Sequence, residues 1–207
     1  MVKISDLIGI SVVALGLVLT PGPNMIYLVS RSITQGRRAG LQSLLGVALG
    51  FFVYLAAATA GIAALFALVP PVYTGLRIAG AAYLLWLAWN AVRPGGHSAF
   101  APKELPADPP RRLFFMGLLT NLLNPKIAVL YISLLPQFVD TARGNVALQM
   151  VILGLTQITI ALTVNSLIVI TAGSVARFLA ARPAWLLGQR YMMGVVLTGL
   201  AVRIVTS

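Results

Sequence analysis

Long stretches without a charged side chain constrain this sequence more than any other feature. Residues 7–30 carry none, and neither do residues 39–76 or residues 146–172. A helix needs about 20 mostly apolar residues to cross the hydrocarbon core of a bilayer, and each stretch is at least that long. The composition agrees, because 59% of the residues are hydrophobic and 9% are charged, against about 45–50% and about 25% in soluble domains. We therefore predict an all-α integral membrane protein that lies in the lipid bilayer.

Six membrane spans fit this pattern. Pro70 and Pro71 divide the run 39–76, which is too long for one crossing. The third span has to extend past Arg77, whose long side chain can reach the interface. Arg190 interrupts the sixth span, so five spans are the alternative. The predicted spans are 7–30, 41–68, 73–92, 113–138, a segment within 146–172, and 184–205.

The basic residues divide unevenly between the two sides of the membrane. Ten of the 15 follow spans one, three and five, four lie on the opposite side, and Lys126 is left inside the fourth span. Cytoplasmic loops carry the excess of Lys and Arg, so both termini are predicted outside the cytoplasm, in a multi-pass protein of the cell inner membrane. The net charge of +11 comes from short clusters between apolar runs. No continuous basic face is formed, and we expect no nucleic-acid partner.

A proline-rich segment, residues 94–112, divides the single transmembrane domain. Its five prolines and its acids Glu104 and Asp108 predict an exposed, irregular cytoplasmic linker. It separates a first repeat of about 1–93 from a second of about 113–207, each with three spans. Because three is odd, homologous halves would lie in the membrane as inverted repeats. Short motifs recur in the same order in both halves, with TPGPN in the first and TNLLNPK in the second.

Both motifs place a proline inside a predicted span. Proline lacks an N–H and blocks the carbonyl one turn back, and such freed groups are tolerated only when buried in protein or lining a wet cavity. Pro21 and Pro125 lie roughly 20 Å into their helices, near the midplane, where secondary transporters bind substrates between inverted repeats. Two ordinary proline kinks are the alternative. We predict that helices one and four are broken near the midplane and form a substrate site from Pro21, Gly22, Pro23, Asn24, Asn121, Asn124, Pro125 and Lys126.

Lys126 is the only charged residue predicted near the middle of the membrane. A cation there is costly and by default marks a functional site. We expect its ammonium to bind a substrate carboxylate, assisted by the free N–H groups of the half-helix that begins after Pro23. The alternative is structural, with the ammonium donating to carbonyls that the breaks set free.

Polar and small residues on spans two and five extend this picture. Three amide side chains are predicted to complete the cavity: Gln42, Gln157 and Asn165. Hydrogen bonding between helices is the alternative for each of them. A stripe of small residues favours close helix packing, either within one chain or across a homodimer: Ala39, Ser43, Gly46 and Gly50.

The two proline motifs, together with the basic GRRAG segment between them, resemble the LysE/RhtB family of amino-acid exporters. The resemblance extends from the first span to the last. By position, residues 21–24 match the first motif of the family and residues 124–126 match the second. The resemblance implies an inner-membrane exporter of amino acids such as lysine, threonine or homoserine, coupled to an ion gradient, for which we expect the proton.

One position departs from the family pattern. Many relatives carry an acid just after the glycine stripe of the second span, where this chain has Phe51 and Phe52. All four acids of the chain are predicted near ends or in loops. We therefore expect no buried carboxylate to act as a proton relay.

Other classes of function lack their residues. An intramembrane hydrolase needs a nucleophile with a base or a metal, but the chain has no cysteine and its single histidine, His97, is in the linker. We expect no enzyme activity, no metal and no cofactor. An exporter of another small solute or cation, a passive channel and a structural membrane protein are the alternatives.

Overall fold

The computed structural model describes residues 2–20, 22–68 and 107–180, together with the scattered positions 78, 81–82, 85–86, 89, 93, 188, 191, 194–195, 198–199 and 201–202. Within these residues the secondary structure is helical and contains no strand, which confirms the all-α prediction for them. Pro21, Arg77, Arg190 and most of the predicted spans 73–92 and 184–205 lie outside the described residues. The count of six spans therefore stays a prediction.

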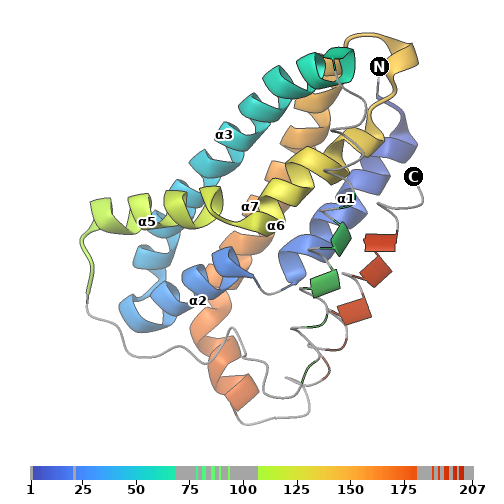
Figure 1. Ribbon diagram of the computed structural model, residues 1–207. Coiled ribbons are helices and arrows are strands. Elements are labelled where there is room, and N and C mark those ends of the chain that lie inside the picture. Colours follow the sequence, from blue (N-terminus) through green and yellow to red (C-terminus); the bar gives the residue numbers. More distant parts are fainter. Residues whose placement is uncertain are drawn as a thin grey trace.

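Five α-helices of 13 residues or more and several shorter elements make up the described ranges of the chain (Figure 1). A π-helix, η1, and a 3-10 helix, η2, continue α6, and a second 3-10 turn, η3, precedes α7. The elements are α1 (Ile4–Leu19), α2 (Pro23–Gln35), α3 (Arg37–Leu68), α5 (Pro110–Leu122), α6 (Pro125–Val129), η1 (Leu130–Leu134), η2 (Leu135–Phe138), η3 (Thr141–Arg143) and α7 (Val146–Ala180).

Two of these helices are long and apolar enough to cross a membrane unaided, over Arg37–Gly61 of α3 and Val146–Ser174 of α7. Two further pairs pass the same test together but are bent. Ile4–Leu19 meets Pro23–Gln35 at 52°, and Pro110–Leu122 meets Pro125–Phe138 at 50°. The second helix of each pair begins with proline, which suits a first helical position because that N–H has no helical partner. The described residues thus hold two spans, or up to four if each bent pair is one span.

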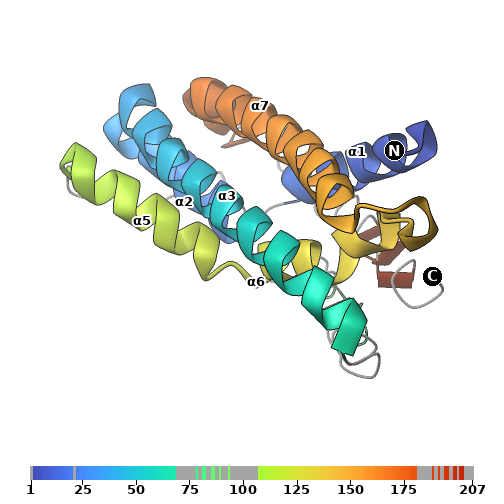
Figure 2. The same ribbon diagram turned by 90° about the horizontal axis from the view of Figure 1, so that it is seen from above.

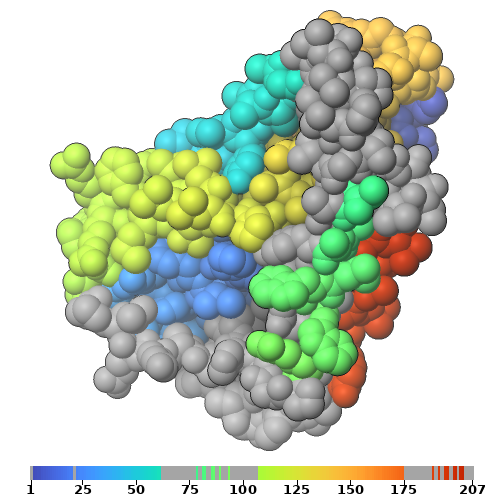
Figure 3. Space-filling model, viewed as in Figure 1, coloured from blue at the N-terminus to red at the C-terminus, as the bar shows by residue number. Residues whose placement is uncertain are grey.

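The small-residue stripe of α3 packs inside the chain. Seen from above, α3 lies between α5 and α7 (Figure 2). A Cβ added to Gly46 would lie 1.9 Å from the Phe114 carbonyl oxygen, and one added to Gly117 would lie 2.1 Å from the Ser43 carbonyl oxygen. The two backbones approach this closely only because both positions are glycine. On the face in Figure 3, α5 and α6 fill the space between α3 and α2.

Large apolar side chains cover the outside of the described helices. They include Val12 on α1, Leu45 on α3, Leu119 on α5 and Leu167 on α7, which are all more than half exposed. Exposed apolar surface on several helices at once is far more than a soluble monomer carries. Lipid contact accounts for it, as the sequence predicts.

The structure corrects two expectations about charge. Arg31, predicted in a cytoplasmic loop, lies within α2, and Asp108, predicted in an exposed linker, is half-buried just before α5. Their side chains form an ion pair with exposed fractions of 8% and 4%. The Asp108 carboxylate is therefore buried against Arg31, and the expectation that no buried carboxylate acts as a proton relay stays a prediction. Paired charges can be buried because each offsets part of the other's desolvation cost, and sequence patterns do not reveal the pairing.

Candidate functional site

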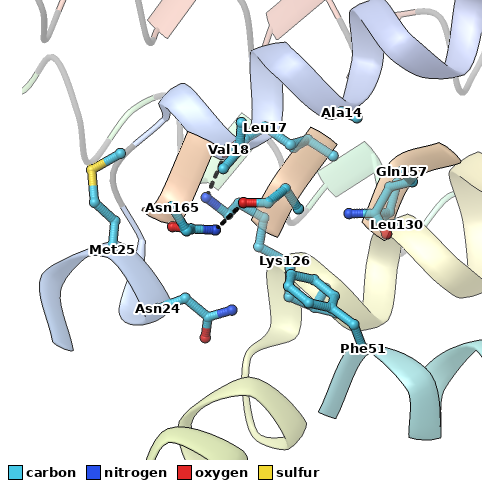
Figure 4. Close-up of a pocket in the computed structure, with 12 residues that line it drawn as sticks. Ala14, Leu17, Val18, Asn24, Met25, Phe51, Lys126, Leu130, Gln157 and Asn165 are labelled. Atoms are coloured by element: carbon cyan, nitrogen blue, oxygen red, sulfur yellow. Dashed lines mark hydrogen bonds between the residues drawn. The ribbon is translucent and has the colours of Figure 1, made fainter. Parts of the chain in front are cut away.

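A small cavity lies beside the break between α1 and α2 (Figure 4). Its free space is about 20 Å³, which is enough for about one water molecule. Elements far apart in the sequence meet there. The lining residues are Ala14, Leu17, Val18, Asn24, Met25, Phe51, Lys126, Ile127, Leu130, Gln157, Ala161 and Asn165.

Lys126 supplies hydrogen-bond donors at the break between α1 and α2. Its Nζ donates to the carbonyl oxygens of Leu17 at 2.9 Å and Thr20 at 2.7 Å, and the residue is buried. In an unbroken helix the Leu17 carbonyl would accept from residue 21, but Pro21 has no N–H. The ammonium supplies the missing donor. These contacts are those of the structural alternative for Lys126, and no contact here tests the predicted carboxylate contact.

Gly22 leaves room for that ammonium. A Cβ at this position would lie 2.9 Å from the Lys126 Nζ and 3.1 Å from its Cε. The Gly22 backbone is extended, with φ of −163°, so other residues can adopt its conformation. The close approach of Lys126 is what requires glycine here.

At the break between α5 and α6, the side chains of Tyr54 and Asn124 make the hydrogen bonds to the backbone. The Tyr54 hydroxyl donates to the Leu122 carbonyl oxygen at 2.7 Å, and the Asn124 Oδ1 accepts from the Lys126 backbone N–H at 3.1 Å. Asn124 is therefore the N-cap of α6, a position that asparagine favours. This cap fixes the start of the helix that carries Lys126.

Three buried asparagines at the breaks keep amide atoms without a hydrogen-bond partner in the described structure. They are both amide atoms of Asn24, both of Asn121, and the Nδ2 of Asn124. A buried amide without a partner is costly, and in native proteins such a group calls for an explanation. Only Asn24 of the three lines the cavity. Asn121 instead faces Gly50, where an added Cβ would lie 2.6 Å from its Oδ1.

The remaining predicted site residues divide into two groups. Gln157 and Asn165 line the cavity; the Gln157 Oε1 accepts from the Tyr131 hydroxyl at 2.7 Å, and the Asn165 Nδ2 donates to Ala161 of its own helix at 2.8 Å. Gln42, Pro23 and Pro125 are not among its lining residues. Pro21 lies outside the described residues.

Sequence reasoning missed the apolar wall of the cavity and the two tyrosines near it. Tyr54 stacks on Tyr131 with ring centroids 5.6 Å apart, and Tyr131 is fully buried. Nothing in the spacing of these residues predicts their partners. Phe51 did carry a signal, because it stands where the family pattern has an acid, and it lines the cavity.

Comparison with known proteins decides the family. The model of the LysE type translocator family matches residues 15–207. This chain belongs to that family. It is therefore a membrane protein of a translocator family rather than an enzyme, and the resemblance found in the sequence is confirmed.

Curated relatives of this translocator include named efflux proteins. It is 30% identical over 192 residues to a leucine efflux protein of Enterobacter sp. (strain 638), covering 91% of this chain and 89% of the relative. It is 28% identical over 193 residues to a leucine efflux protein of Klebsiella pneumoniae, covering 93% and 91%. An uncharacterized membrane protein, YahN of Escherichia coli (strain K12), is 37% identical over 115 residues, covering 55% and 52%. No solved structure matches the chain.

Proposed function

We propose that this translocator exports amino acids with apolar side chains across the inner membrane, by alternating access at the cavity beside the α1–α2 break. The family membership and the leucine efflux relatives support export of this class. The observation that carries the proposal is that one break brings a helix C-terminus and a helix N-terminus to the same cavity.

These two helix ends match the two charges of an amino acid. The C-terminal end of α1 offers the carbonyls of Leu17 and Thr20, and a helix C-terminus attracts a cation. The first N–H groups of α2, which starts at Pro23, have no helical acceptor and attract an anion. We assign the substrate ammonium to the first end and its carboxylate to the second. The unpaired amide of Asn24, in the first turn of α2, offers a further donor and acceptor to the cavity.

The rest of the cavity suits an apolar side chain. Eight of its twelve lining residues are apolar, and the others are Asn24, Lys126, Gln157 and Asn165. Within the described lining there is no carboxylate to bind the side-chain amine of lysine. We therefore favour leucine-like substrates over the basic or hydroxylated ones that the family resemblance also implies.

The size of the cavity bears on the mechanism. Drug-sized ligands occupy pockets of about 300–1,000 Å³, whereas this cavity offers about 20 Å³. We propose that the structure represents a closed conformation. Each bent pair would be one span broken near the midplane, and rotation at the two breaks would open the cavity to either side in turn.

An ion pair between distant segments bears on the topology. Lys3 Nζ lies 2.8 Å from Asp140 Oδ2, so the N-terminus and the loop before α7 are on the same side of the membrane. An even number of crossings must separate them. The bent pair α1–α2, α3, and the bent pair that starts with α5 supply three, and we propose that the predicted span 73–92 is the fourth.

Transport by purified protein tests the proposal. Liposomes loaded with unlabelled leucine should accumulate radiolabelled leucine transiently and saturably, which a passive channel cannot do. Asn24→Ala should lower this counterflow about tenfold, as expected for about 1.4 kcal/mol of lost binding. Thr171→Ala, an exposed side chain on α7, is the matched control and should transport normally. The proposal would be refuted if none of the amino acids tested gave counterflow.

A further inference from the structure

The Lys126 ammonium occupies a cation site built from backbone. It takes two carbonyl oxygens at the C-terminal end of α1, at 2.9 Å and 2.7 Å, and Gly22 provides the space beside it. A substrate ammonium has the same charge and the same three N–H donors. The carbonyls that suit one group therefore suit the other.

Within the described residues, no acidic side chain neutralises the charge of Lys126. Asp6 of α1 is two turns or more from the break, Arg31 of α2 is paired with Asp108, and α7 carries no charged residue between 146 and 174. On α3 the charged residues are Arg37 and Arg38, and Tyr54 donates its hydroxyl to Leu122. Tyr131 of η1 donates to Gln157. No carboxylate of the described helices faces the ammonium, which is costly for a buried cation.

We propose that Lys126 carries the coupling proton, and that its ammonium competes with the ammonium of the substrate for the carbonyls of Leu17 and Thr20. This inference rests on the proposed function and deepens it. It differs from the role expected from the sequence, in which Lys126 binds the substrate carboxylate.

The competition yields proton-driven export. When the site faces the cytoplasm, Lys126 releases H⁺ to water and becomes a neutral amine, and the substrate ammonium takes the two carbonyls. When the site faces outward, the amine takes up H⁺ from outside and the ammonium regains the carbonyls, which expels the substrate. One proton enters for each amino acid that leaves. No carboxylate relay is needed, in keeping with the absence of an acid after the glycine stripe.

Lysine is the residue that suits this role. It can exist as a neutral amine in a buried site, whereas arginine is always charged. Its ammonium lies close against Gly22, 2.9 Å from where a Cβ would be. Lys126→Arg should therefore hold the site in its proton-loaded form and weaken leucine binding at every pH.

Binding measured against pH tests the competition. In wild-type protein in detergent, the Kd of leucine should rise by up to about tenfold per pH unit as the pH falls, since one proton competes with one substrate. Lys126→Met should bind leucine with a Kd constant within about twofold from pH 6 to 9. Lys126→Gln, which likewise carries no titratable group, serves if the Met variant fails to fold. Lys3→Met is the control and should keep the wild-type profile.

Substrate analogues separate the two roles of Lys126. Leucine amide keeps the ammonium and lacks the carboxylate, whereas 4-methylpentanoate has only the carboxylate. Leucine amide should displace labelled leucine at pH below about 7, where its amine is protonated, and 4-methylpentanoate, which can reach only the N-terminal end of α2, should displace it far more weakly. Displacement by 4-methylpentanoate alone would overturn the competition in favour of the carboxylate role.

Transport completes the test. Folded Lys126→Gln protein should lose leucine accumulation driven by a pH gradient, whereas Thr171→Ala should keep it. A wild-type protein without any amino-acid counterflow refutes the proposed function. A wild-type protein with counterflow, together with a folded Lys126→Gln protein that no longer binds leucine, refutes only the inference. A pH-independent wild-type Kd refutes it as well.

Discussion

Gly22 is the residue at which a single added methyl group should act directly on the Lys126 ammonium. In Gly22→Ala the new Cβ would lie 2.9 Å from the Lys126 Nζ, so the ammonium has to shift, which we expect to weaken its bonds to the two carbonyls. We expect lower transport and a loss of about 1–3 kcal/mol of stability, as for other overpacked sites. Thermal unfolding and counterflow measure both effects. Gly61→Ala, which meets nothing within 4 Å, is the control, and an equal effect there would contradict this account.

The buried carboxylate of Asp108 neutralises Arg31. It also accepts from Gln35 and pairs with the exposed Arg112 at 3.0 Å. Asp108→Asn should cost about 3–5 kcal/mol, because it leaves the Arg31 cation buried without its partner. The comparison is Arg112→Ala, which removes a surface pair and should cost less than about 1 kcal/mol. Unfolding in detergent measures both, and similar losses would show that the buried pair is no stronger than the surface one.

Asp140 gives the stability a dependence on pH. A hydrogen bond from Lys3, the charge of Lys3 and that of Arg143, and the Ala142 N–H hold the pKa of this carboxyl below its ordinary value of 3.8. A lowered pKa in the folded protein stabilises it at pH above 3.8, and the effect is lost as the pH falls through the lowered pKa. Lys3→Gln should therefore lower the melting temperature slightly at pH 7. The difference should shrink below pH 3.8, whereas Lys3→Arg should match the wild type throughout.

At the scale of elements, the contact between α3 and α5 depends on two glycines. Gly46→Val would drive its side chain into the Phe114 carbonyl, 1.9 Å from the added Cβ. We expect the two helices to separate and the protein to lose at least about 3 kcal/mol, since backbone cannot yield as a side chain can. Gly173→Val, with nothing within 4 Å, is the matched control. Expression level and melting temperature report the outcome, and a well-folded Gly46→Val protein would contradict it.

Prediction from the sequence succeeded for elements whose signal is local. The charge-free runs predicted α3 and α7, which are long and apolar enough to cross a membrane. The prediction that helices one and four are each one span broken near the midplane stays a prediction. The Arg31–Asp108 pair and the bond from Tyr54 to the Leu122 carbonyl were not predicted. Each joins residues more than 60 positions apart, and a single sequence records neither partner. For the same reason, the sequence placed Lys126 in the site but left its acceptors open.

At the scale of the whole molecule, the distribution of basic residues predicts the orientation. Even without Arg31, whose charge is paired with Asp108, nine basic residues against four predict both termini outside the cytoplasm. A reporter fused after Ser207 that is active only in the cytoplasm should be inactive, and one active only outside should be active. The same reporters fused after Gly144, in the loop beside Lys3, provide the reference. A cytoplasmic signal after Ser207 would favour five spans.

The bond from Lys126 to the Leu17 carbonyl also sets an order of assembly. The two residues are 109 positions apart, and synthesis proceeds at about 5–20 residues per second, so the carbonyl is made roughly 5–20 seconds before its donor. During that interval the first helix pair cannot settle in lipid with its break complete. It has to wait in a wetter place, such as the insertion machinery or the membrane surface, until the segment that bears Lys126 arrives. The α1–α2 pair can therefore complete its burial only after the predicted fourth span, which carries Lys126, has been inserted.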